Sequence, residues 1–212
     1  MAIIKVQKGT KDILPPEMPL WHFMETKANE VFTKFGAKEI RTPIFEATEL
    51  FARGVGDTTD IVNKEMYTFE KSERSLTLRP ENTAGVVRSF IENGMHRLAA
   101  PVKLWYKGPM FRYERPQAGR QRQFHQVGVE VFGIKQATAD AEVILMAVNY
   151  LKALGLNDLS VELNSLGCPE CREEFKKKLK SVIKPYLSEL CPDCQARYEK
   201  NPLRLLDCKV EE

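Results

Sequence analysis

The sequence predicts an α+β protein in which an antiparallel β-sheet is flanked by helices and followed by a mainly helical tail. Residues 104–114 and 123–132 alternate with the period of two that is typical of β-strands. Other segments carry apolar residues at helical spacing. Beyond Ser165, Lys, Glu, Cys and Pro replace the alternating pattern. We therefore predict a core over residues 1–165 and a Cys-containing helical segment over residues 166–212.

Each element of the predicted core has a local signal. In chain order we expect a helix over residues 20–35 ended by Gly36, a strand over 40–44, a hairpin of 66–70 and 75–78, a helix over 82–93 ended by Gly94, a helix over 140–154 ended by Gly155, and a strand over 160–164. Pro43 lacks a backbone N–H, so its strand should lie at an edge or an interface. This order favours an antiparallel sheet over repeated βαβ units.

Composition sets limits on the function. The 212 residues carry a formal net charge of only +3, so any contact with nucleic acid must be local. Hydrophobic residues make up 43% of the chain, which is enough for a sizeable core. Charges interrupt every apolar run well before the ~18 residues that a membrane span needs. We expect no signal peptide, no membrane partner and a cytoplasmic location.

The hairpin of residues 104–132 should present one polar face. On that face the period of two places Met110, Arg112 and Glu114 of the first arm and Phe124, Gln126, Gly128 and Glu130 of the second, opposite Val127, Val129 and Val131. Gly128 would leave room for a planar, charged ligand. A solvated sheet face gives the same alternation, and from alternation alone it is the more common outcome. His125 shares the valine face, where we expect a core histidine.

The turn of this hairpin is rich in arginine. Arg115, Arg120 and Arg122 fall within eight residues, and Pro116 and Gly119 set the backbone. The planar guanidinium fork suits phosphate oxygens, so the turn is a candidate contact for a nucleotide or for nucleic acid. A solvated, charged turn remains the alternative.

Four segments in chain order resemble one family. The run from Gly108 to Phe132 resembles motif 2 of class II aminoacyl-tRNA synthetases in the bacterial histidyl-tRNA synthetase version. Lys8–Pro16 resembles the opening of that family, and Glu39–Glu46 resembles its motif 1. Leu78–Ala84 resembles its amino-acid-binding segment. The resemblance implies an incomplete class II catalytic core and, through motif 1, a homodimer.

The resemblance also implies a reaction and its residues. Histidine would be activated with ATP to histidyl-adenylate with release of pyrophosphate, and would then be transferred to the 3′ end of its tRNA. Arg112, the catalytic candidate, would hold the α-phosphate, Glu114 the adenine amino group and Arg120 the outer phosphates. Phe124 would stack on adenine, and Mg²⁺ would bridge the phosphates. Arg115 and Gln117 are candidate contacts to the tRNA acceptor end.

A histidine ligand needs acceptors for its ammonium and its imidazole. The residues that resemble the ammonium-binding set of the family are Glu81, Thr83 and Gln126, and Glu130 resembles its imidazole partner. Without the resemblance, Glu81 is better explained as an acid at a helix start, where it favours the dipole.

All five cysteines lie in the tail. Cys168 and Cys171 form one CxxC pair, Cys191 and Cys194 form a second after nineteen residues, and Cys208 follows. Two such pairs fit a tetrahedral zinc site, which would leave Cys208 over. Ordinary reduced thiols at the ends of a helical hairpin are the alternative, and we favour it because zinc is not a defining feature of the family resembled. Disulfides fit a cytosolic protein least.

Two other functions are compatible with parts of the sequence. A synthetase-like regulatory subunit of ATP phosphoribosyltransferase would sense histidine, but it has little reason to keep the nucleotide residues of motif 2. A stand-alone nucleic-acid-binding module would use the basic turn alone. The 212 residues contain no recognisable motif 3 or anticodon-binding domain, so we expect this chain by itself to bind ATP weakly and to activate histidine poorly.

Overall fold

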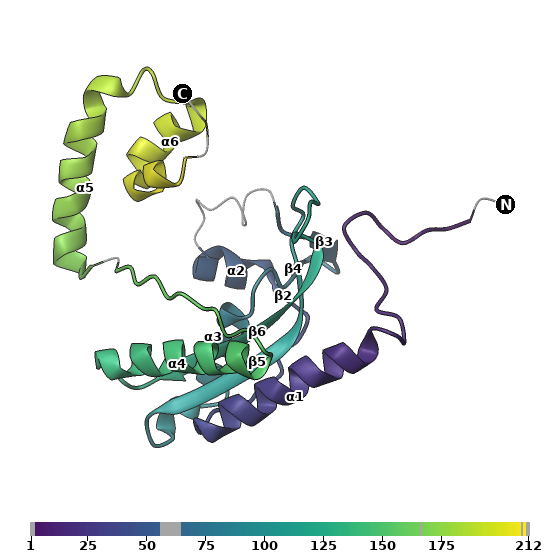
Figure 1. Cartoon of the computed structure of the whole chain (residues 1–212). Helices are drawn as coiled ribbons and strands as arrows, with labels where there is room; N and C mark the ends of the chain where they lie inside the picture. Colours follow the sequence, from purple (N-terminus) through teal and green to yellow (C-terminus); the bar gives the residue numbers. More distant parts are fainter. Residues whose placement is uncertain (1–2, 56–64, 166, 209, 211–212) are drawn as a thin grey trace. The chain divides into compact units, whose positions relative to one another are not determined.

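The computed structural model describes residues 3–55, 65–165, 167–208 and 210 (Figure 1). The chain forms two compact units, Met1–Leu159 and Ser160–Glu212. The division lies a few residues before the boundary predicted at residue 165, because the segment that precedes the tail helices goes with the second unit.

The first unit contains two small sheets. Their strands are β1 (Lys38–Glu39), β2 (Phe45–Ala47), β3 (Thr68–Lys71), β4 (Arg74–Leu78), β5 (Val102–Phe111) and β6 (Gln123–Phe132). One sheet has the order β1-β5-β6 and the other the order β2-β4-β3. The short β1 pairs in parallel with β5, and the other pairs are antiparallel. The predicted α+β class, with antiparallel pairing dominant, is confirmed.

Helices cover both faces of the long β5–β6 hairpin. The helices of this unit are α1 (Met18–Lys34), α2 (Thr48–Val55), α3 (Thr83–Glu92), the 3₁₀ turn η2 (Met95–Arg97) and α4 (Ala137–Ala153). Helices α1 and α4 lie side by side along one face, where Phe32 and Met146 pack with Trp105 (Figure 1). On the other face Val86 of α3 packs with Met110. The helices predicted before Gly36, Gly94 and Gly155 are thereby confirmed, with shifted ends.

The single strand predicted over residues 40–44 is wrong. Residues 40–44 form no strand and connect β1 to β2, two short strands that belong to different sheets. The Ile40 N–H donates to the Trp105 carbonyl (2.9 Å), and the Ile44 carbonyl accepts from the Arg79 N–H (2.9 Å). Because proline cannot donate to a ladder, the segment crosses from one sheet to the other at that residue.

The hairpin predicted around residues 66–78 is confirmed as β3 and β4. Its turn residues Ser72 and Glu73 have φ values of 49° and 61°. Two successive left-handed residues are typical of the tight turn whose twist matches that of the flanking strands. The turn expected between the two predicted strands, in the run Ser72-Glu73-Arg74, therefore lies where the sequence placed it.

The strand predicted over residues 160–164 is absent. These residues are described, but they form no ladder with any strand in the described ranges. Alternation of Val161 and Leu163 gives a segment β-propensity, but a strand exists only where a partner edge accepts its hydrogen bonds. Leu163 accordingly remains 77% exposed.

The second unit is mainly helical, as predicted. It contains α5 (Pro169–Ile183), the 3₁₀ turn η3 (Lys184–Tyr186), α6 (Pro192–Lys200) and η4 (Pro202–Asp207). Its hydrophobic cluster is small: Cys194, Tyr198 and Leu205 are buried, and partly buried residues of α5 and the following turn pack against them.

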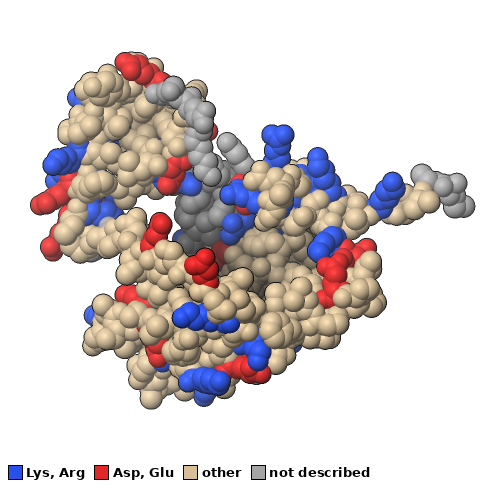
Figure 2. Space-filling view, viewed as in Figure 1, with Lys and Arg blue, Asp and Glu red and all other residues tan. Residues whose placement is uncertain are grey.

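The surface is mixed in charge. On the face seen in Figure 2, basic and acidic side chains of the described residues are interspersed over each unit. This distribution agrees with the small net charge of +3. Among the helices that the structure describes, none combines the length and the apolar character of a membrane span.

Candidate nucleotide and amino-acid site

The register of β5 and β6 gathers the predicted polar residues on one face. Met110 lies opposite Phe124, Gly108 opposite Gln126, and Leu104 opposite Glu130. Directly opposed residues of an antiparallel pair share a face, so the residues proposed from the two arms lie on the same side of the hairpin. This face is also packed against α3, so it is more than a solvated sheet surface.

Arg112 is held over an aromatic ring on this face. Its Nε donates to the Pro80 carbonyl (2.9 Å), and the guanidinium carbon lies 5.2 Å from the centroid of Phe124. Its Nη1 is 3.8 Å from a carboxylate oxygen of Glu114. The backbone carbonyl and the ring fix the direction of the guanidinium while leaving part of it accessible.

The Glu114 carboxylate lies between two guanidinium groups. Arg120 Nη1 donates to its second oxygen (3.3 Å), opposite the contact with Arg112. Arg122 Nε donates to the backbone carbonyl of Glu114 (3.2 Å), and its guanidinium lies 3.9 Å from the ring centroid of Tyr113. The basic turn is thus tied to the end of the hairpin by its own arginines.

The opening segment of the chain packs against this turn. The Gly9 carbonyl accepts the backbone N–H of Arg122 (2.6 Å), and Gly9 has a φ of +84°. A Cβ at Gly9 would lie 2.7 Å from Arg122 Cγ, so both conformation and space favour glycine there. The segment that resembles the family's opening therefore contacts the segment that resembles its motif 2.

Three of the four candidate histidine-binding residues form one cluster. The Thr83 hydroxyl donates to Glu130 (2.8 Å), while the Glu81 carboxylate accepts from the N–H groups of Thr83 (2.6 Å) and Ala84 (2.9 Å). Glu81 therefore fills the helix-start role that its position predicts without the resemblance. Gln126 shares the face but lies four residues from Glu130 along β6, about 13 Å at strand spacing.

Burial perturbs the carboxyl group of this cluster. Loss of hydration raises the pKa of Glu130, and the nearby charge of Glu81 raises it further, while hydrogen bonds from Thr83 and Tyr106 lower it. A buried carboxylate that holds hydroxyl partners is well suited to exchange one of them for a polar ligand.

Sequence reasoning missed Tyr106. It pairs directly opposite Gly128, and a Cβ at Gly128 would collide with its Cζ and Oη atoms. The room that Gly128 was expected to leave for a ligand is therefore filled by the tyrosine ring. Burial, followed by the charge of Glu130, raises the pKa of Tyr106 to about 12, so its hydroxyl stays protonated. The sequence did carry a signal for this contact. Tyr106 is an aromatic residue on the polar face of the first arm, and it can pair with Gly128 on the second.

Arg79 is the second site residue that the sequence pattern did not single out. It is 5% exposed, and its Nε donates to the Pro109 carbonyl (2.9 Å). Its Nη1 donates to the Thr42 carbonyl (3.2 Å) and lies 3.4 Å from Asn82 Oδ1. Arg79 thus joins the connection between β1 and β2 to β5 and to the start of α3. A charged residue between apolar Leu78 and Pro80 was the signal.

The tRNA candidates lie apart from these clusters. Arg115 and Gln117 are exposed in the turn, and the backbone of Gln117 pairs with that of Arg120 (2.9 and 3.2 Å) around Gly119, whose φ is +76°. The turn is therefore an ordered hairpin loop, and the Arg115 side chain is accessible from solvent.

A cavity of about 650 Å³ is lined by the candidate Gln126 and by residues from the other face of the hairpin. Lys107, Val127 and His125 line it, together with Trp21 and the motif 1 residue Thr42. The prediction of a core histidine is wrong, because His125 is exposed at this cavity and meets Trp21 edge-on (4.6 Å between centroids). Partial loss of hydration lowers the pKa of His125.

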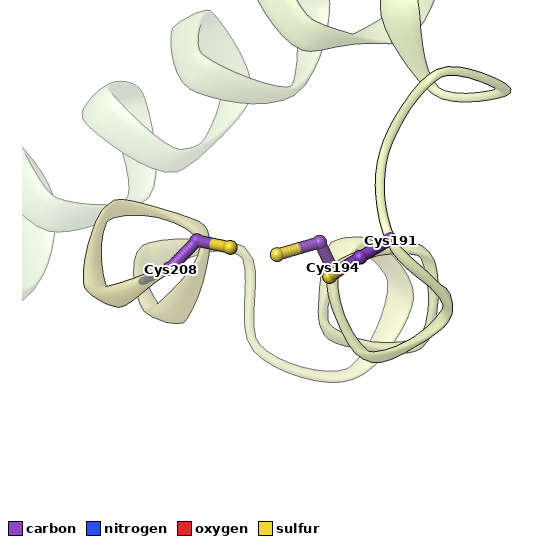
Figure 3. A group of neighbouring side chains, drawn as sticks. All are labelled: Cys191, Cys194 and Cys208. Atoms are coloured by element: carbon purple, nitrogen blue, oxygen red, sulfur yellow. The ribbon is translucent and has the colours of Figure 1, made fainter. Parts of the chain in front are cut away.

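The four-cysteine zinc set predicted from spacing is not brought together. The sulfurs of Cys168 and Cys171 are 3.0 Å apart at the start of α5, whose 15 residues extend about 22 Å before the second pair is reached. Cys191 and Cys194 instead gather with Cys208, the residue that the spacing left over (Figure 3). Spacing could not reveal this grouping because it depends on how the chain folds back after α6.

Known proteins share this sequence and arrangement. A family model described as histidyl-tRNA synthetase matches residues 9–170. The chain belongs to the histidyl-tRNA synthetase family. A histidine–tRNA ligase of Desulforamulus reducens is 60% identical over 205 residues, which are 96% of this chain and 49% of that protein. This family member thus spans about half the length of the curated relatives it matches.

Solved structures agree with the family assignment. The apo histidyl-tRNA synthetase of S. aureus has a TM-score of 0.79 and 42% identity, and the match covers 99% of this chain and 49% of that one. A Bacillus halodurans C protein titled as an ATP phosphoribosyltransferase regulatory subunit/histidyl-tRNA synthetase has a TM-score of 0.66 at 22% identity, over 89% and 52% of the two chains. At that identity the second likeness concerns the fold alone.

Proposed function

We propose that this chain is the part of a histidine–tRNA ligase that binds ATP and histidine, forms histidyl-adenylate and passes histidine to the 3′ end of its tRNA. The observation that carries the proposal is the placement of Arg112, anchored by the Pro80 carbonyl above Phe124 and next to Glu114. A fixed guanidinium beside an aromatic ring and a carboxylate suits a purine nucleotide, whose parts are a planar base, an amino group and phosphates.

In the proposed activation step, a carboxylate oxygen of histidine attacks the α-phosphorus of ATP, and the bond to the bridging oxygen of pyrophosphate breaks. Arg112 neutralises charge at the α-phosphate, where it develops during the transfer. Adenine stacks on Phe124 with its amino group at Glu114. Magnesium would accompany the phosphates, because Mg²⁺ keeps several waters and binds substrate oxygens.

Arg120 is the most exposed of the charged residues in the proposed nucleotide set. Its side chain is 56% exposed and is held by a contact of 3.3 Å with Glu114. An exposed ion pair of this kind contributes little stability, so the exchange of Glu114 for outer phosphate oxygens costs little. The exchange would also free Glu114 for the adenine amino group.

The proposed histidine pocket uses the cluster at the start of α3. The ammonium group is bound by Glu81, Thr83 and Gln126, and the imidazole N–H is accepted by Glu130. Gln126 and Glu130 are ~13 Å apart along β6, and the Tyr106 ring covers Gly128 between them, so the amino acid would lie over that ring. A pocket that hydrogen-bonds an N–H rejects analogues that lack it, because its own carboxylate would stay unpaired.

The remaining partners follow from the same proposal. Arg115 and Gln117 would contact the acceptor end of the tRNA, in the cytoplasm where tRNAs are charged. A homodimer through motif 1 is supported by Ile44 and Phe45, which are 44% and 53% exposed around β2, a strand that pairs with β4 on one side. An edge strand with exposed apolar residues favours pairing with a second copy.

The regulatory-subunit alternative is less well supported. Its solved relative shares the fold at 22% identity, whereas the ligases reach 60%. A histidine sensor has no need of Arg112, Glu114, Arg120 and Phe124 in one connected group, and such a group is present here.

Calorimetric titration of ATP and histidine, separately and together, tests the proposal. We expect histidine-selective binding that strengthens when ATP is present, and weak ATP binding by this chain alone. Arg112→Ala should abolish the ATP effect, and Arg97→Ala, in η2, should leave it unchanged. Histidine binding that ignores ATP would favour the regulatory subunit. Histidine-dependent exchange of pyrophosphate into ATP should fall about 10²–10³-fold in Arg112→Ala if the chain supports it.

A further inference from the structure

Three thiols converge in the helical unit although they come from different elements. The sulfurs of Cys191, Cys194 and Cys208 all lie within 4.8 Å of one another. Cys191 and Cys194 belong to the start of α6, and Cys208 follows η4, from where its sulfur points toward that of Cys194 (Figure 3). Tetrahedral zinc–thiolate bonds of about 2.3 Å place sulfurs about 3.8 Å apart, so the cluster needs only a small contraction to hold a metal ion.

The local backbone places two of the three thiols at the start of one helix. Cys191 is the N-cap of α6, and Cys194 lies in its first turn after Pro192. The CxxC spacing lets two thiolates chelate one ion, and the fold supplies the third from Cys208, fourteen residues after Cys194.

The surroundings of the cluster are apolar. A cavity of about 210 Å³ is lined by the three cysteines and by Ile183, Leu190, Leu205 and Val210. An apolar shell limits solvent access and strengthens the attraction between a cation and thiolates. Soft sulfur ligands in such a setting select zinc over the hard cations magnesium and calcium.

The helical unit also has little else to hold it together. In the part that the structure describes, its buried hydrophobic cluster consists of Cys194, Tyr198 and Leu205. Phe175, Val182 and Tyr186 remain 49%, 58% and 56% exposed. Units of roughly 50 residues with so small a core usually need a metal, a disulfide or a partner. A metal between Cys194 and Cys208 would join α6 to the segment after η4.

We propose that Cys191, Cys194 and Cys208 bind one zinc ion as thiolates, with the fourth position open to water at the apolar cavity. The bound ion stabilises the helical unit and takes no part in the adenylation proposed above. Each thiol releases its proton as it binds, so uptake of zinc is accompanied by release of protons. Cys168 and Cys171, at the far end of α5, stay outside the site.

Alkylation of the unaltered chain is the first test, because it needs no variant. The reduced chain is incubated with equimolar zinc and then with a maleimide, and the modified cysteines are identified by mass spectrometry. We expect Cys191, Cys194 and Cys208 to be protected by zinc and Cys168 and Cys171 to react. Reaction of all five, or protection of the two CxxC pairs with Cys208 modified, would overturn the proposal.

Metal content and cobalt substitution supply the second test. Native mass spectrometry should find one zinc per chain, and cobalt in its place should give a thiolate charge-transfer band whose intensity corresponds to three sulfurs. Cys208→Ser, a change at an exposed residue, should remove about a third of that band and weaken zinc binding at least about tenfold. The control Cys168→Ser/Cys171→Ser should change neither. A chain that carries a Cys194–Cys208 disulfide and no zinc under reducing purification would overturn the inference.

Discussion

The ring of Tyr106 lies across Gly128, its directly opposed partner on β6, and closes the space that a glycine in a sheet otherwise leaves. The hydroxyl of Tyr106 reaches the cluster of Thr83 and Glu130. The glycine is therefore required by a side chain of the protein itself, and the tyrosine links the middle of the hairpin to the proposed histidine pocket.

Gly128→Ala should destabilise the first unit by about 1–3 kcal/mol, because the added methyl group collides with a buried ring. Urea unfolding followed by tryptophan fluorescence measures this, since Trp21 and Trp105 both lie in that unit. In combination with Tyr106→Ala, the glycine change should cost less than it does alone. Additivity within about 0.5 kcal/mol would show that the two residues do not interact.

Glu130 should make the stability of the first unit depend on pH. Its pKa in the folded protein is raised above the ordinary value of 4.5, so the folded chain holds the proton more tightly than the unfolded chain. Stability therefore falls as pH rises from about 4.5 through the raised pKa. Glu130→Gln stays neutral and should lack this component. Its unfolding free energy, subtracted from that of the unaltered protein at each pH, should reveal the fall, and a flat difference would contradict the assignment.

Arg79→Ala should cost about 3 kcal/mol or more, because it leaves the Pro109 and Thr42 carbonyls without their buried donor. Arg79→Lys should recover only part of this loss, since an ammonium group cannot reproduce the fork. The control is Arg41→Ala, whose side chain is 77% exposed and should change stability by no more than about 0.5 kcal/mol. If the two variants lost the same free energy of unfolding in urea, Arg79 would not be the residue that connects these segments.

Arg115→Ala should weaken tRNA binding and lower the salt dependence of the affinity by about one phosphate contact. The measurement is a titration of labelled tRNA at several salt concentrations, with the slope of log affinity against log salt as the readout. Arg97→Ala is the matched control, because it removes one exposed charge in η2, before β5 begins and outside the turn. The same slope for the Arg115 variant and the unaltered chain would remove Arg115 from the tRNA interface.

Local chemistry explains most of the successful predictions. The period of two places Phe124 and Glu130 on one face whatever surrounds the hairpin, because successive strand residues point to opposite sides. Helix ends were predictable for a similar reason, since Gly36 and Gly155 adopt the positive φ that terminates a helix. The tail was predicted as helical from composition, and it is.

The predictions that failed each depended on a partner distant in sequence. The segment around Pro43 divides between two sheets because the Trp105 carbonyl accepts from Ile40 on one side and the Arg79 N–H donates to Ile44 on the other. Residues 160–164 form no strand because no edge in the described ranges pairs with them. Residue type and spacing do not indicate which distant strand or backbone group will be available for hydrogen bonding.

The fold class, the polar face of the hairpin and the family could all be read from the sequence. Three features emerged only from the folded chain: Tyr106 fills the space at Gly128, Arg79 is a buried donor, and Cys208 takes the place of the first CxxC pair beside the second. The reason is physical: periodicity and turn chemistry act within a few residues, whereas these contacts form when packing brings together residues far apart in the chain.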